Sequence, residues 1–209
     1  RLKQPYDTRI VTRLVSMIGA PCLIFSTLST IDGLSLDIGY MAFAAIVAIS
    51  IFALVGSVIL RISGLPLRTF LAPISFPNAG NMGLPLCLFA FGDEGLALGI
   101  GFFAVSATLQ LVLGQWLYSG LPTPVPLLKA PIPYAVALGA ILMELEVNPP
   151  VFVTNTTSLL GNFTIPLMMM TLVVSLGRMK VVRLRLSFAL SALRLGMGAI
   201  VGFALAEAF

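Results

Sequence analysis

Seven stretches of apolar residues follow one another along the chain, separated by short segments that hold most of its charged residues. A helix needs about 20 apolar residues to cross a bilayer, and six of the stretches have about that length. The fifth is shorter, with 14 uncharged residues between Lys129 and Glu144. The pattern predicts an all-α membrane protein with seven spans, at about residues 14–31, 39–60, 69–92, 95–119, 131–143, 151–177 and 186–206.

The charged segments between the spans alternate in sign. Basic segments precede the first span and follow the second, fourth and sixth, and they hold eleven of the twelve Lys and Arg residues. Acidic residues dominate the segments after the first, third and fifth spans. Because positively charged loops stay in the cytoplasm, residue 1 and the basic segments are expected there. The short fifth span must cross, since without it every later segment would change sides.

The amino-acid composition indicates that lipid, and not water, surrounds most of the chain. Hydrophobic residues make up 58% of the chain and charged residues 10%, against roughly 25% charged in a soluble domain. The mean hydropathy of +1.06 fits a protein that is embedded in lipid. The net charge of +4 comes from loops, where basic residues orient helices, so nucleic acid is not an expected partner.

Because the sequence has no histidine and no cluster of metal ligands, we expect no catalytic residue, metal site or cofactor, and no enzyme.

The third span is interrupted by prolines and glycines. Within residues 73–85 they stand too close together for one continuous helix: Pro73, Pro77, Gly80, Gly83 and Pro85. Unwound backbone inside a membrane persists only where protein buries it or where it lines a wet cavity. Secondary transporters use such broken helices to place half-helix ends at a substrate or ion. We therefore expect the span to unwind between about Pro77 and Gly83, and the chain to transport a solute.

Two asparagines lie inside this break and supply both hydrogen-bond donors and acceptors. The N–H groups that open a half-helix favour a carboxylate, whereas the carbonyl groups that end the other half favour a cation. Asn78 and Asn81, with the backbone at Gly80 and Gly83, form the predicted substrate site. The two glycines permit close approach of a ligand and positive φ. The alternative is that both asparagines only cap the broken ends.

Residues in other spans are candidates for the same cavity. Asn162 shares one helical face with Asn155 and Ser158, and this face either lines the cavity or bonds to another helix. Gln110 has the same two alternatives. Arg194 is the one charged residue inside a span, where contact with lipid would cost at least about 2.5 kcal/mol. We expect it to contact an anionic substrate, to pair with an acid, or to extend toward the cytoplasm.

A weak internal repeat links the first and sixth spans. At an offset of 145 residues, Leu14 aligns with Leu159 and Pro21 with Pro166. Two apolar helices match this well by chance. Inverted halves require five helices each. The chain is therefore expected to begin one helix late and to end before the last two helices of a ten-helix carrier.

The segment FPNAGNMGLPL at residues 76–86 and the FGDEGLALG turn that follows it resemble the crossover region of the auxin efflux carrier family. The segments APCLIF and IPLMMMTLVVSLGRMK are similar to the second and seventh helices of that family. The resemblance implies ten helices in two inverted five-helix repeats, a fold related to the bile-acid sodium symporters. The compact loops resemble those of a bacterial member.

The resemblance also implies two structural parts. Residues 1–35 and 121–180 would form a scaffold, whereas 36–120, with the crossover at 73–85, and 181–209 would form a transporter part with an incomplete second repeat. The implied function is secondary transport of a small organic anion, auxin-like or malate- or malonate-like, by alternating access. A homodimer through the scaffold helices, embedded in a bacterial cytoplasmic membrane, is expected.

A seven-helix receptor or a structural membrane protein without transport activity is the alternative. A receptor of the familiar type has its N-terminus outside the cell, whereas residue 1 is expected inside, and it has no use for a broken helix. For a carrier, the sequence leaves open the substrate, the direction of transport and the coupling ion, H+ or Na+.

Overall fold

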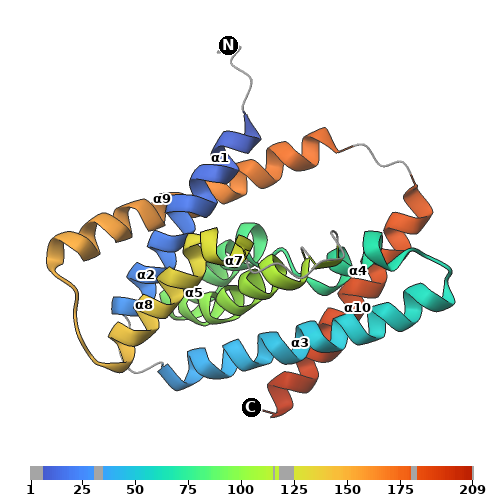
Figure 1. Cartoon of the computed structure of the whole chain (residues 1–209), viewed down its shortest axis with the longest axis horizontal. Helices are drawn as coiled ribbons and strands as arrows, with labels where there is room; N and C mark the ends of the chain where they lie inside the picture. The colour runs from blue at the N-terminus through green and yellow to red at the C-terminus, as the bar shows by residue number, and fades with distance from the viewer. Residues whose placement is uncertain (1–6, 31–34, 115, 118–124, 180–182, 209) are drawn as a thin grey trace.

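The computed structural model describes residues 7–30, 35–114, 116–117, 125–179 and 183–208. All regular structure in these ranges is helical, as predicted (Figure 1). Three wider π-helical turns, labelled η, interrupt the α-helices. In chain order the elements are α1 (Thr8–Leu14), η1 (Val15–Gly19), α2 (Ala20–Thr30), α3 (Ser35–Ile62), α4 (Leu67–Ser75), η2 (Ala79–Gly83), α5 (Leu84–Leu109), η3 (Gln110–Gly114), α7 (Val125–Lys129), α8 (Pro131–Glu144), α9 (Val151–Arg178) and α10 (Leu184–Ala208).

Among the described residues, five helical stretches are long and apolar enough to cross a membrane. Four correspond to single predicted spans, and the fifth, Leu67–Gly114, contains two of them. It folds back at Gly92, whose φ of 69° and ψ of −155° favour glycine. As a result, Gly99 packs against Cys87. α8 is apolar but shorter, as its sequence predicts. In the described residues, each of the seven predicted stretches is therefore mainly helical.

The helices pack in two groups (Figure 1). In the first group α2 packs against α8 and α9, and a Cβ added at Gly161 of α9 would lie 2.8 Å from Leu23 Cα. In the second group α3 packs against α4 and α5, and α10 joins it through Met197, which packs in one core with Ile74 of α4. A larger core that contains Leu23 of α2 and Ile100 of α5 joins the two groups.

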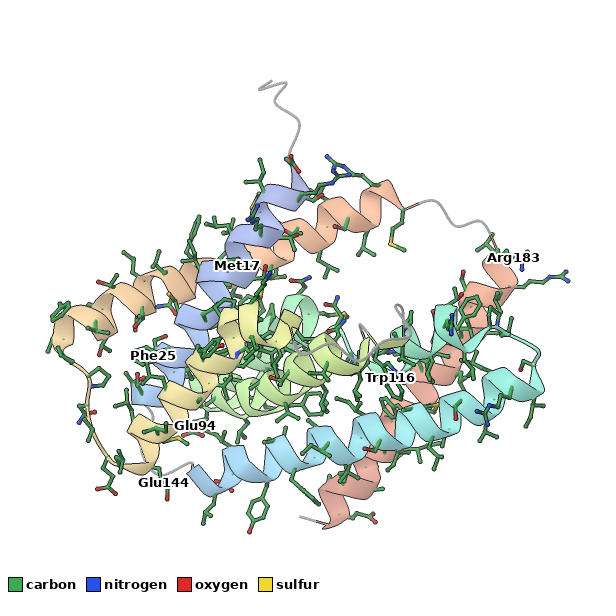
Figure 2. The ribbon with its side chains drawn as sticks, in the orientation of Figure 1. Met17, Phe25, Glu94, Trp116, Glu144 and Arg183 are labelled. Atoms are coloured by element: carbon green, nitrogen blue, oxygen red, sulfur yellow. The ribbon has the colours of Figure 1, made fainter. Side chains whose placement is uncertain are left out.

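Apart from Arg194 in the middle of α10, the described charged residues lie near the ends of the helices or at the Gly92 fold-back. Glu94 follows the fold-back at Gly92, and Glu144 ends α8; both lie toward one side of the molecule (Figure 2). Arg183, just before α10, lies on the opposite side (Figure 2). These positions follow the alternation of acidic and basic segments along the chain.

Candidate functional site

The break in the third predicted span lies between α4 and η2. α4 ends at Ser75, and Phe76 has an extended backbone with φ −95° and ψ 123°. Asn78 also departs from helical geometry, with φ −79° and ψ 58°. Pro77, which lies between them, has no N–H to donate to a helix. The predicted interruption is therefore present, and it comprises residues 76–78.

The break is narrower than predicted. The sequence places unwound backbone as far as Gly83, but Ala79–Gly83 form the π turn η2. Gly80 and Gly83 would permit positive φ, but neither is among the described glycines that adopt it. The missing Cβ at Gly80 instead permits close packing, because a Cβ there would lie 3.0 Å from Phe103 Cε2.

The carbonyl groups at the end of α4 lose their helical partners at the break. In a continuous helix the carbonyl of Pro73 would accept from residue 77, which as proline has no N–H. One guanidinium nitrogen of Arg194 donates to that carbonyl, and the other donates to the carbonyl of Phe76 at 2.6 Å. Arg194 therefore supplies the donors that Pro77 and the extended backbone remove.

On the other side of the break, the N-terminal end of η2 presents backbone N–H donors. The carbonyl of Asn78 accepts from the N–H groups of Met82 and Gly83 at 3.3 and 3.2 Å. The N–H groups of the residues just after Asn78 have no carbonyl within the helix to bond. The Asn78 side chain makes no cap hydrogen bond, and neither its amide nor that of Asn81 bonds to another described residue. Among the described residues, the structure therefore does not show the capping alternative.

A cavity of about 430 Å³ opens at this break. Ligand pockets commonly have about 300–1,000 Å³, so the volume suits a small solute. Among the described residues that line it, none has a charged side chain. Its polar lining consists of Thr12, Ser16, Asn78, Asn81, Ser106 and Gln110.

All three π turns in the described helices line this cavity, η1 through Ser16, η2 through Asn81 and η3 through Gln110. Two of these turns end two residues before a proline, Pro21 or Pro85. Because proline lacks the N–H that an α-helix requires, a turn with one extra residue accommodates the missing hydrogen bond. π turns occur frequently at functional sites. Their convergence marks this cavity as the candidate site.

Serine hydroxyls in the lining bond to their own helices. Ser16 Oγ donates to the carbonyl of Thr12 at 2.7 Å, and Ser106 Oγ donates to the carbonyl of Phe103 at 3.0 Å. Their protons are engaged, whereas the amides of Asn78 and Asn81 bond to no described residue. The cavity therefore offers neutral amide donors and acceptors together with backbone N–H groups.

The structure brings part of the predicted site together. Pro77, Asn78, Gly80 and Asn81 line the cavity, and so does Gln110, for which the sequence left two alternatives. The remaining predicted residues do not line it: Pro73, Gly83, Pro85, Asn162 and Arg194.

Asn162 is exposed, because α9 turns a different face toward its neighbours: Gly161 lies against α2 and Thr164 against η1. The sequence did not single out the lining residues Thr12, Ser16 and Ser106. Pro21, inside a predicted span, was the available signal for η1.

The sequence profile of a family described as membrane transport protein matches residues 2–122, more than half of the 209 residues. The matched region includes the break and all three π turns. No curated protein and no solved structure matches the chain. The chain therefore belongs to the membrane transport protein family, which is the family of the auxin efflux carriers.

Proposed function

We propose that this chain is a secondary active transporter that binds a small organic anion at the break and moves it by alternating access. The observation that carries the proposal is that three π turns meet at one cavity of about 430 Å³, together with two asparagine amides that bond to no described residue. Membership in a family of membrane transporters supports it. The proposal places the protein in a bacterial cytoplasmic membrane with residue 1 in the cytoplasm.

A carboxylate suits this cavity better than a cation does. The residues that open the second half of the broken helix, Ala79 to Asn81, line the cavity, and helix N-termini carry partial positive charge. The carbonyl groups at the other end of the break already accept hydrogen bonds from Arg194. A fixed dipole stabilises an anion most strongly where water is excluded. The proposed substrates are therefore small mono- or dicarboxylates, auxin-like or malate- or malonate-like.

The position of the cavity supports alternating access. Its lining comes from both helix groups: Ser16 and Met168 belong to the group around α2, whereas Asn78 and Ser106 belong to the group around α3. In carriers of this class, one rigid group rocks against the other around a fixed site. We propose that α1, α2, α8 and α9 are the scaffold, and that α3, α4, α5 and α10 carry the substrate.

Binding and uptake of carboxylates test the proposal. The purified chain should be stabilised against heat by at least one small carboxylate, and vesicles that contain it should take up that compound saturably. Amines and neutral sugars of similar size should neither stabilise the chain nor compete. Uptake with and without sodium and a pH gradient identifies the driving ion. A folded chain that no carboxylate stabilises would contradict the proposal.

We also propose a homodimer that forms through α9. Large apolar side chains recur on its outer surface at positions that share one face: Leu159, Phe163 and Met170 are 73%, 61% and 52% exposed. In a variant without Cys22 and Cys87, cysteine at Leu159 or Phe163 is expected to cross-link two protomers under mild oxidation. Cysteine at Leu54 of α3, which is 67% exposed, is the matched control and should not cross-link. Equal cross-linking at all three positions would remove α9 as the interface.

A further inference from the structure

The guanidinium of Arg194 occupies the carbonyl end of the broken helix. Its two nitrogens donate to the carbonyls of Pro73 and Phe76, residues that lie more than a hundred positions earlier in the chain. Both carbonyls need an outside partner, the first because residue 77 is proline and the second because the helix is interrupted after it. A planar fork of donors bridges two such oxygens in a way that a single N–H group cannot.

A packed surface of α10 holds this guanidinium in place. Met197, one turn beyond Arg194, is buried in a core that contains Ile74 of α4 and Phe52 of α3. Leu190 and Leu193 pack against the same core. No described carboxylate pairs with Arg194. Its positive charge therefore faces the oxygens and the negative dipole end of α4, where cations are favoured.

We propose that the guanidinium of Arg194 occupies the position at which a broken helix would otherwise bind a metal ion. The cavity therefore works without a bound sodium ion at this end of the break. In carriers with broken helices, the carbonyl groups of the unwound backbone and the C-terminal ends of the half-helices coordinate the coupling ion, Na+ or H+. Here the protein supplies the positive charge itself. Arg194 is thus a positioning residue that fixes the carbonyl end of the break while the N–H end faces the ligand.

The first test uses the unmodified chain. At one ionic strength, its melting temperature in sodium, potassium or choline chloride should be the same, because an ion without a site cannot stabilise the folded state by binding. A rise of several degrees that is specific to sodium would overturn the inference. This measurement needs no substrate, so it is independent of the proposed transport function.

The second test removes the guanidinium and returns it. Arg194→Ala should lower the melting temperature by about 5 °C or more, because two carbonyls in the membrane lose their donors. Millimolar guanidinium, far below the molar concentrations that unfold proteins, should restore part of this loss. Arg185→Ala on the same helix is the matched control, since Arg185 is exposed and bonds to no described residue; it should show neither effect.

A third variant keeps the inference testable if Arg194→Ala does not fold. Arg194→Lys retains a cation near the same oxygens and should be more stable than Arg194→Gln, which is neutral but keeps an amide donor. Equal losses in the lysine and glutamine variants, or no rescue of Arg194→Ala by guanidinium, would overturn the role of the charge.

Discussion

Alanine at Asn78 or at Asn81 is expected to weaken binding of a transported carboxylate by roughly five- to 150-fold. The loss of one amide leaves a ligand oxygen without its donor, which costs about 1–3 kcal/mol, and 1.4 kcal/mol corresponds to a factor of ten in affinity. Neither amide bonds to a described residue, so the fold should stay intact. Isothermal calorimetry with the carboxylate that best stabilises the chain provides the measurement.

The control for this experiment is Asn155→Ala. Asn155 is an exposed asparagine on α9 that does not line the cavity, so its replacement should leave affinity unchanged. Both cavity variants should melt at the temperature of the unmodified chain. Unchanged affinity in both Asn78→Ala and Asn81→Ala would remove these side chains from the binding site.

Gly161→Ala is expected to destabilise the chain by about 1–3 kcal/mol, although the change adds a single methyl group. The added Cβ would lie 2.8 Å from Leu23 Cα and 3.0 Å from Leu23 N. Because these are backbone atoms, a rotamer change cannot relieve the overlap, and α2 must shift away from α9. Thermal unfolding followed by the fluorescence of the single tryptophan, Trp116, measures the loss.

Gly177→Ala is the matched substitution on the same helix. Nothing lies within 4 Å of a Cβ at Gly177, so the added methyl group meets open space. Alanine also has the higher helix propensity, so this variant should be as stable as the unmodified chain or slightly more stable. If both variants melt at the same temperature, close packing at Gly161 does not hold α2 against α9.

The helices and the break were predictable because their signals are local. Uncharged stretches of sufficient length specify spans, and Pro77 removes a backbone donor wherever it lies. Gly92, followed directly by two acidic residues, separates two apolar stretches and proves to be the fold-back. Asn78 and Asn81 reach the cavity because the same local break carries them there.

The remainder of the site depends on packing between distant segments. Helical periodicity places Asn162 on one face of α9 but does not say which face packs against the neighbouring helix. That face is the one with Gly161 and Thr164, which lie against Leu23 and Gly19. The partners of Arg194 lie on another helix and are backbone oxygens, which have no signature in the sequence. The π turns depend on how each helix accommodates a proline, and sequence alone does not predict whether it kinks, ends or widens.

The hydrogen bonds of Arg194 also bear on where the molecule bends. A break that contains proline and glycine would be an obvious hinge, but α10 holds the free end of α4 through Pro73 and Phe76. The core around Met197 joins the same two helices a turn away. We therefore expect α4, the break and α10 to move as one rigid body during transport. The flexibility that exposes the cavity to either side of the membrane must then lie where the two helix groups slide past each other.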